Sequence, residues 1–353
     1  MIIGIANNLY PPHGRGSGAE VIAAKMADEL RREGHEVFII TTKPLQSSIK
    51  NTNNCYYLVS HYEQLANWPN FKKIAWHIGQ LLFPPHQQAL KTIIKTRKPD
   101  LVITHNLIGL GFFLPQLLYR QNIKHKHILH DIQLLHPSGL MYWQQEKIIS
   151  SLAARSYQFL TRRAFKNTTQ VQSPSQWLLN LHQQHNFFNQ SINTVQPNFN
   201  LAKIQPKKIN TPVRFSFTGQ IEKHKGINTL ISAWEKAGLS AEQAQLIIAG
   251  AGSLAQAVAT KIKKFDNLQY IGYLDRHGIN HLLDNTDVVV TPSLVYENSP
   301  TSLWEAAEHG CRALASDIGG IPELKPYLEM TLVPPGDIDA LAQAFKQYAK
   351  SGQ

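Results

Sequence analysis

The chain has 353 residues, of which 43% are hydrophobic and 17% charged, and its formal net charge is +11 at pH 7. The length fits two domains of ordinary size, and the composition excludes a disordered, collagenous or repeat protein. The two cysteines, Cys55 and Cys311, lack zinc-ligand spacing, and the sequence shows neither a signal peptide nor an apolar run of 18 residues, so we expect a cytoplasmic protein.

The first half of the sequence alternates apolar strands with helical segments. Strands are expected at residues 2–6, 37–42, 99–105 and 125–131. A glycine-rich loop at 10–18 leads from the first strand into a helix that Gly34 ends. This strand, loop and helix pattern indicates a parallel sheet.

The second half repeats the alternation after residues 197–212, a segment of Pro, Asn and Lys that predicts a linker. Strands are expected at 213–219, 244–249, 267–273, 286–293 and 311–317, and helices at 226–238, 253–265, 300–310 and 338–350. We therefore expect an α/β fold of two Rossmann-like, doubly wound domains, at 1–200 and 201–353, that face a cleft. Ligands of such sheets bind beyond the carboxyl ends of the strands.

Residues 291–324 carry the richest chemistry. Ser299 is expected to be the N-cap of a helix with Pro300 at its first position, and the free backbone amides of Thr301 and Ser302 would suit a diphosphate. Glu305 would lean back toward the start of this helix, where its carboxylate can accept hydrogen bonds from a ribose diol.

Glu297 precedes the expected cap and could accept hydrogen bonds from the hydroxyls of a sugar on the same diphosphate. As a bare pair, two glutamates eight residues apart are usually surface residues. In this context, however, Glu297 and Glu305 resemble the Glu-x7-Glu signature of family 4 retaining glycosyltransferases, which have the GT-B fold. The resemblance implies that Glu297 contacts the donor sugar and Glu305 the nucleotide ribose.

Further motifs extend the resemblance over most of the chain. They are the glycine loop YPPHGRGSGAE at 10–20, the strand ends THN at 104–106 and LHD at 129–131, SPS at 173–175, and FTGQIEKHKG at 217–226, which resembles the phosphate-clamp loop. One position departs from the pattern, because Gln220 stands where the family usually has an arginine, whereas Lys225 is retained. One of two phosphate-binding cations is thus missing.

Three groups of site residues follow from this resemblance. The catalytic residues would be His130, which would orient the sugar or polarise the reaction, together with Glu297 and Lys225. The acceptor side would hold His105, Asn106 and Asp131, the last orienting its loop. Donor-binding residues would be Gly18, Gly219, Gln220, Lys225, Gly252, Tyr273, Leu274, Glu297, Asn298, Ser299, Thr301, Ser302 and Glu305, with Tyr273 and Leu274 contacting the nucleobase through the backbone.

The expected reaction needs neither a metal nor a cofactor, because no Asp-x-Asp metal motif lies at a strand end. A UDP- or GDP-hexose would be the co-substrate, and a glycan or lipid-linked molecule the acceptor. A nucleotide-sugar epimerase of the same fold would instead turn over the donor without an acceptor. A catalytically weakened homologue, suggested by Gln220, would bind nucleotide without turnover.

The positive charge lies in the N-terminal half. Residues 1–200 carry 20 Lys and Arg against 9 Asp and Glu, whereas residues 201–353 carry 15 of each. This asymmetry indicates an anionic partner or merely a basic solvated surface. Nucleic acid is not expected, since no motif for it is present.

Residues 71–98 mix large apolar and basic side chains, which is typical of a segment that binds at a membrane surface. The apolar ones are Phe71, Ile74, Trp76, Ile78, Leu81, Leu82 and Phe83, and the basic ones Lys72, Lys73, Lys91, Lys95, Arg97 and Lys98. The prediction is peripheral attachment to the anionic inner face of the membrane. In the alternative, the apolar residues face the core and only the basic rim is solvated.

Overall fold

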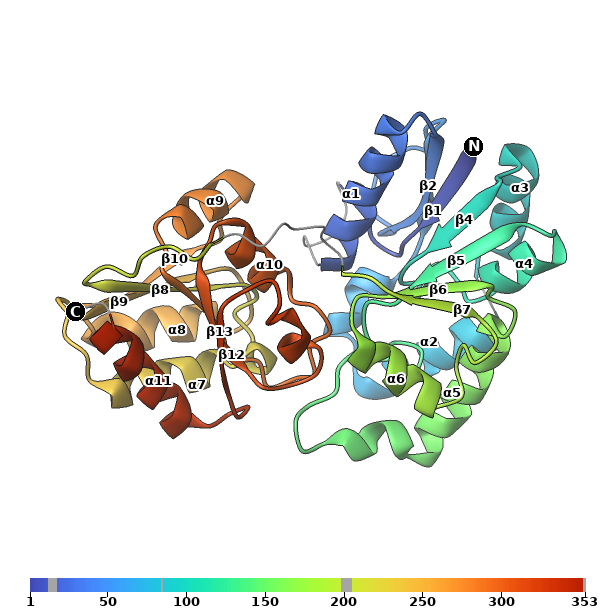
Figure 1. Cartoon of the computed structure of the whole chain (residues 1–353). Coiled ribbons are helices and arrows are strands. Elements are labelled where there is room, and N and C mark those ends of the chain that lie inside the picture. The colour runs from blue at the N-terminus through green and yellow to red at the C-terminus, as the bar shows by residue number, and fades with distance from the viewer. Residues whose placement is uncertain (12–17, 84, 198–204, 352–353) are drawn as a thin grey trace. The chain divides into compact units, whose positions relative to one another are not determined.

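The computed structural model describes residues 1–11, 18–83, 85–197 and 205–351. The chain forms two compact units. Unit 1 comprises Met1–Leu140 and Lys147–Asn198, and unit 2 comprises Met141–Glu146 and Phe199–Gln353. Relative to the boundary expected at residue 200, the difference is the short segment Met141–Glu146. Each unit is a parallel sheet with helices packed on it, which confirms the expected α/β fold class (Figure 1).

The sheet of unit 1 has seven parallel strands in the order β3-β2-β1-β4-β5-β6-β7. They are β1 (Ile2–Ala6), β2 (Glu36–Lys43), β3 (Cys55–Val59), β4 (Leu101–Thr104), β5 (Lys124–Ile128), β6 (Gln170–Ser173) and β7 (Ile192–Val195). The chain reverses its direction across the sheet between β1 and β4, so the loops after these strands lie side by side. There, the backbone NH of Asn8 donates to the carbonyl of Asn106 at 2.8 Å.

Unit 1 contains the helix expected after the glycine loop and further helices between its strands. The α-helices are α1 (Gly18–Arg32), α2 (Asn70–Leu82), α3 (Gln87–Arg97), α4 (Leu114–Arg120), α5 (Leu152–Phe165) and α6 (Gln176–Gln184), and the 3-10 turns are η1 (Tyr62–Asn67) and η2 (Glu146–Ser150). Gly18 is the first residue of α1, and the part of the expected glycine loop at 12–17 lies outside the described residues. No described helix combines the length and the apolar character needed to cross a membrane.

Unit 2 holds a six-stranded parallel sheet in the order β10-β9-β8-β11-β12-β13. Its strands are β8 (Val213–Thr218), β9 (Ala244–Ala249), β10 (Leu268–Gly272), β11 (Val288–Thr291), β12 (Arg312–Ser316) and β13 (Met330–Val333). Its helices are α7 (Ile227–Ala237), α8 (Ala255–Lys261), α9 (Arg276–Asp284), α10 (Thr301–Glu308) and α11 (Ile338–Ser351), and its 3-10 turns are η3 (Lys223–Lys225), η4 (Ile262–Lys264) and η5 (Ile321–Leu324).

Both faces of the unit 2 sheet are covered by apolar side chains. Alternate residues of a strand point to opposite faces, and β11 shows this directly. Val288 and Val290 belong to the cluster that packs under α7 and α11, whereas Val289 belongs to the cluster that contains Leu303 and Trp304 of α10. This double covering explains why β11 reads as an uninterrupted run of valines.

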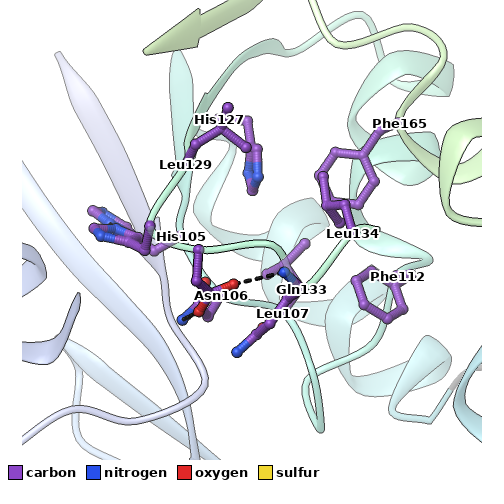
Figure 2. Close-up of a pocket in the computed structure, with 11 residues that line it drawn as sticks. His105, Asn106, Leu107, Phe112, His127, Leu129, Gln133, Leu134 and Phe165 are labelled. Atoms are coloured by element: carbon purple, nitrogen blue, oxygen red, sulfur yellow. Dashed lines mark hydrogen bonds between the residues drawn. The ribbon is translucent and has the colours of Figure 1, made fainter. Parts of the chain in front are cut away.

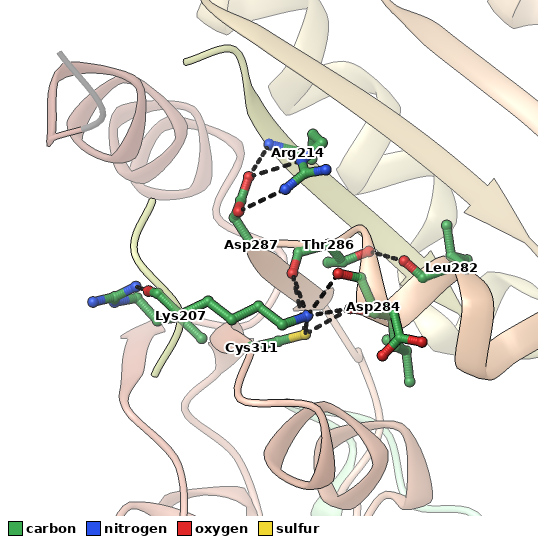
Figure 3. A network of polar contacts seen from close by, with 9 residues as sticks. Lys207, Arg214, Leu282, Asp284, Thr286, Asp287 and Cys311 are labelled. Atoms are coloured by element: carbon green, nitrogen blue, oxygen red, sulfur yellow. Dashed lines mark hydrogen bonds and ion pairs between the residues drawn. The ribbon is translucent and has the colours of Figure 1, made fainter. Parts of the chain in front are cut away.

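The described end of the expected linker is anchored to unit 2 by Lys207 (Figure 3). Its Nζ donates to the carbonyls of Leu283 at 2.7 Å and Asp284 at 3.0 Å, at the C-terminal end of α9. A cation at this position satisfies carbonyls that the helix itself leaves unpaired. Arg312 donates to the Lys207 carbonyl at 2.6 Å, so the segment is held from two sides. Residues 198–204 of the expected linker lie outside the described residues.

Candidate functional site

The loops after β8, β9, β11 and β12 converge at the carboxyl edge of the unit 2 sheet, where the sequence places the ligand. The NH of Ile221 donates to the Ala251 carbonyl at 2.9 Å, which joins the first two loops. The NH of Leu294 donates to the His224 carbonyl at 2.9 Å, and the NH of Gly320 to the Glu297 carbonyl at 2.8 Å. These bonds tie all four loops into one edge.

Two glycines make this convergence possible. A Cβ on Gly252 would lie 2.4 Å from the Ile221 carbonyl oxygen, and one on Gly319 would lie 2.2 Å from the Glu297 carbonyl oxygen. Gly319 also has a φ of 63°, which L side chains rarely adopt. These two glycines therefore set the distance between the loops.

Lys225 and Glu297 form the central ion pair of this edge. The Lys225 Nζ lies 2.6 Å from Glu297 Oε1, and the Ser293 hydroxyl donates to the same oxygen at 2.7 Å. The two side chains are largely buried, with 14% of the Glu297 side chain exposed. Burial alone would raise the pKa of Glu297, but the charge of Lys225 and these hydrogen bonds hold it below its usual value. Glu297 is therefore an anion at neutral pH.

Helix α10 begins one residue later than expected. Its N-cap is Pro300, which makes no side-chain capping bond, and the expected N-cap Ser299 instead accepts a hydrogen bond from the Trp304 indole at 2.6 Å. The buried indole NH needs a hydrogen-bond acceptor, and the Ser299 oxygen supplies it in place of capping the helix. Thr301 and Ser302 are still the first two residues of the helix, so their backbone amides lie at its N-terminal end, where an anion can bind.

Glu305 has a partner that the sequence did not indicate. Arg276, the first residue of α9, donates to Glu305 Oε1 at 2.6 Å and also reaches Glu308 at 3.4 Å. Burial raises the pKa of Glu305, and Arg276 partly offsets the effect. Helix α9 was not predicted, although its apolar residues Ile279, Leu282 and Leu283 have helical spacing. Asp275 caps the helix by accepting from the Gly278 NH at 2.8 Å.

The other predicted donor residues of unit 2 lie along the same edge. Gly219 and Gln220 follow β8 and are exposed, whereas Asn298 is buried beside Glu297 in the loop before α10. Tyr273 and Leu274 follow β10, at the end of the row of strands, and the Tyr273 side chain is exposed. Lys225 and Gln220 therefore share one loop, with the lysine turned toward Glu297.

In unit 1, the predicted residues at the ends of β4 and β5 form one cluster, in which His105 is buried and Asn106, His130 and Asp131 are half-buried. His105 Nδ1 lies 2.7 Å from His130 Nε2 and the two rings are stacked. Burial lowers the pKa of His130 to about 4, so the imidazole is neutral at pH 7. His105 has no exposed surface, which leaves it in contact with His130 rather than with a ligand.

Asp131 and Asn106 orient the same loop. Asp131 accepts hydrogen bonds from the Gln133 NH at 2.7 Å and from the Asn106 amide at 3.3 Å. Burial raises the pKa of Asp131 to about 7. The cavity beside these residues measures ≈ 10 Å³, the size of one water molecule rather than of a sugar (Figure 2).

Comparisons with known proteins match both halves of the chain. The model "Glycosyltransferase Family 4" matches residues 16–200, and "Glycosyl transferases group 1" matches residues 212–351. Over 348 residues the chain is 24% identical to an uncharacterized 42.6 kDa protein in the cps region of Klebsiella pneumoniae, covering 93% of this chain and 88% of the relative. It is 28% identical over 156 residues to the amylovoran biosynthesis glycosyltransferase AmsK of Erwinia amylovora, covering 39% and 38% of the two chains.

Solved structures share the fold over the whole chain. Sucrose-phosphate synthase from Thermosynechococcus elongatus superposes with a TM-score of 0.67 at 18% identity, covering 99% of this chain and 92% of that one. HepE of Anabaena in complex with UDP gives a TM-score of 0.68 at 15% identity, covering 100% and 93%. The fold is therefore GT-B, which confirms the expectation from sequence.

Proposed function

The chain belongs to glycosyltransferase family 4, and we propose that it transfers a hexose with retention from a UDP- or GDP-hexose to a glycan or lipid-linked acceptor in polysaccharide biosynthesis. The relatives support the biological setting, because one is a protein of a cps region and another an amylovoran biosynthesis glycosyltransferase.

The observation that carries this proposal is the Lys225 and Glu297 pair beside the start of α10. A donor diphosphate would lie against the Thr301 and Ser302 amides, with Lys225 neutralising its charge. The anionic carboxylate of Glu297 would accept hydrogen bonds from the hydroxyls of the attached hexose. The positive end of the helix and the lysine stabilise the charge that develops on the leaving diphosphate, without a divalent cation.

In the proposed reaction the bond between the anomeric carbon and the phosphate oxygen breaks, and the acceptor hydroxyl attacks the same face of the sugar. The departing phosphate oxygen takes the hydroxyl proton, so the products are a glycoside and a nucleoside diphosphate. His130 is half-buried and neutral, which suits a hydrogen-bonding group that orients the sugar and not a general acid.

A panel of UDP, GDP and ADP with their hexose conjugates tests this function by thermal shift, because a bound ligand stabilises the folded state by mass action. We expect one nucleoside diphosphate to raise Tm, and its sugar conjugate to be consumed only when an acceptor glycan is added. Donor turnover without an acceptor would favour the epimerase. Binding of a nucleotide sugar without turnover would favour the weakened homologue.

We also propose that the enzyme attaches to an anionic membrane surface through α2. Phe71, Ile78 and Leu82 are 69%, 50% and 54% exposed, and their spacing places them on one face of the helix, with the exposed Phe83 after its end. The side chain of Ile74 lies outside the described residues, and Trp76 and Leu81 are half-buried.

Further exposed side chains, basic and apolar, lie on α2 and on a neighbouring helix. Lys72 on α2 is exposed, and α5, which packs against α2, adds the exposed Leu152, Phe159 and Arg163. Arg97 instead pairs with Glu36 at 2.6 Å. Apolar side chains that could insert, together with cations beside them, are the two components of interfacial binding.

A further inference from the structure

A pocket of ≈ 630 Å³ lies in unit 2 beside the candidate donor site. All of its lining residues belong to this unit. Trp143, Gln144 and Gln145 form one wall, and Lys223 and Leu294 form another. Its volume is that of a small-molecule site and is sufficient for one or two sugar rings. Lys223 lies two residues before Lys225, and Leu294 three residues before Glu297, so the pocket adjoins the expected sugar end of the donor.

The wall that carries Trp143 is held firmly on the loop before α10. The NH of Trp143 donates to the Leu294 carbonyl at 3.0 Å, and the NH of Tyr296 donates to the Met141 carbonyl at 2.9 Å. The Tyr296 hydroxyl donates to Glu146 Oε1 at 2.6 Å. The segment Met141–Glu146 is thus a short strand-like strap on the loop that also carries Glu297.

Gln144 adopts a left-handed backbone conformation with a φ of 64°. A non-glycine residue is rarely found there, and such a conformation persists only where the surroundings determine it. The Gln144 NH donates to Glu146 Oε1 at 2.9 Å, and the Gln145 NH donates to the Tyr142 carbonyl at 3.0 Å. These bonds hold a tight turn that presents both glutamine side chains, which are exposed, at the pocket.

The residues of the pocket match the chemistry of a saccharide. The Trp143 side chain is partly exposed, and the negative face of an indole attracts the weakly positive C–H groups on one face of a sugar ring. Each glutamine amide can both donate to and accept from hydroxyl groups. Lys223 is exposed, and no carboxylate pairs with it in the part of the chain that the structure describes, so its cation is open to an anionic substituent.

We propose that this pocket binds one saccharide unit of the acceptor, beyond the acceptor-side residues His105, Asn106 and Asp131 expected in unit 1, and that this unit bears a negative charge, either a carboxylate or a phosphate. The assignment rests on the proposed glycosyl transfer and adds the chemical class of its second substrate. Trp143 stacks on the sugar ring, the two glutamines bind its hydroxyls, and Lys223 selects the charge.

Saturation-transfer NMR with the full chain tests the assignment, using methyl glucuronide, glucose 6-phosphate and methyl glucoside as probes. The wild type should give stronger signals with a charged probe than with the glucoside, and the stronger of the two charged probes identifies the source of the charge. Trp143→Ala should weaken binding of every probe about fivefold, the order of one aromatic contact, and Trp143→Phe should restore most of it. Lys223→Ala should abolish only the preference for charge.

Calorimetry with UDP and GDP separates this inference from the proposed function. Both Ala variants should bind nucleoside diphosphate as the wild type does. If the wild type binds nucleotide but transfers saturation to no probe, the acceptor assignment is overturned while the donor site stands. If Lys223→Ala weakens nucleotide binding, Lys223 serves the donor diphosphate and the selection of charge is overturned. Absence of nucleotide binding in the wild type contradicts the proposed function itself.

Discussion

Lys225 and Glu297 lie 72 residues apart in the sequence, yet their side chains form an ion pair of 2.6 Å. Each is the other's charged partner at the edge where four loops meet. A change at one residue therefore alters the electrostatics of the other, and the two roles expected from sequence, at the diphosphate and at the sugar, are physically coupled.

The coupling predicts a specific pattern of stability. Lys225→Met leaves the largely buried Glu297 without its cation and should lower the free energy of unfolding by about 2 kcal/mol. Adding Glu297→Gln should recover part of this loss, because the unpaired charge is removed. Urea denaturation of the single and double variants measures both effects.

Lys236→Met is a matched control for that experiment, since Lys236 pairs with Asp339 on the surface. Lys236→Met should lower the free energy of unfolding by less than about 0.5 kcal/mol. An equal decrease in the free energy of unfolding for Lys225→Met and Lys236→Met would show that the pair of Lys225 and Glu297 contributes no more than a surface ion pair.

Substitutions at the two glutamates of the signature should affect different steps, nucleotide binding at Glu305 and turnover at Glu297. Glu305→Gln should weaken nucleoside diphosphate binding about tenfold, the order expected for a lost hydrogen bond to a charged acceptor. Glu297→Gln should change this affinity little while lowering turnover about a hundredfold, because its proposed partner is the transferred sugar. Calorimetry with nucleotide alone and initial rates of transfer provide the two readouts.

Glu308→Gln supplies the control, because Glu308 also reaches Arg276 but lies a turn further along α10. Its nucleotide affinity should match that of the wild type. Unchanged affinity in Glu305→Gln would remove the ribose assignment, and equal weakening in Glu308→Gln would trace the effect to Arg276.

Acid should destabilise unit 1. Burial lowers the pKa of His125, His130 and His182 to about 4, below the ordinary 6.5. Between these values the unfolded chain binds more protons than the folded one, so stability falls as pH drops from 6.5 toward 4. Each histidine contributes about 1.4 kcal/mol per pH unit in that window.

The contribution of Asp131 to stability changes with pH in the opposite direction. Its pKa is raised to about 7, so between about pH 4 and pH 7 the folded chain binds a proton that the unfolded chain does not. Asp131→Asn removes this opposing effect, so the free energy of unfolding should fall more steeply as the pH is lowered. Urea denaturation of the wild type and the variant at pH 7.5, 6.5 and 5.5 measures the slopes. The same stability at pH 5.5 and 7.5 in the wild type would contradict the prediction.

Anionic vesicles should pellet the protein at low salt, and about 0.5 M salt or neutral vesicles should release it, because salt shortens the electrostatic range. Phe71→Ser should reduce the pelleted fraction by removing an apolar side chain that inserts. Ile192→Ser, an equally exposed position on β7, should leave it unchanged. A protein that stays in the supernatant under all conditions would favour a soluble acceptor.

Transfer should continue in EDTA, because the proposed stabilisation of the leaving group comes from Lys225 and the start of α10. The expected rate lies within about twofold of the untreated enzyme, a difference well below 1 kcal/mol in the barrier. Loss of activity that manganese restores would overturn the metal-independent mechanism.

Elements with a strong local pattern could be predicted from the sequence alone. The valine run of β11 and the helical periodicity of α7 and α11 were predicted because burial on one or both faces leaves its period in the sequence. The strands β3, β6, β7 and β13 were not predicted, since each is only four or five residues long and leaves too short a pattern. The local sequence favours Ser299 as the N-cap of α10, but its hydroxyl oxygen instead accepts a hydrogen bond from the buried Trp304 indole.

Contacts between residues far apart in the chain could not be predicted, because they depend on the three-dimensional fold. The Tyr296 hydroxyl bonds to Glu146 across 150 residues of sequence, and Arg276 bonds to Glu305 across 29. Neither contact leaves a period or a spacing in the sequence, because each depends on which strand ends and helix ends the sheet order places side by side. The segment Met141–Glu146, and with it the pocket beside Lys223, is a further example, because Tyr142 pairs with Val295 in the loop before α10, far along the chain.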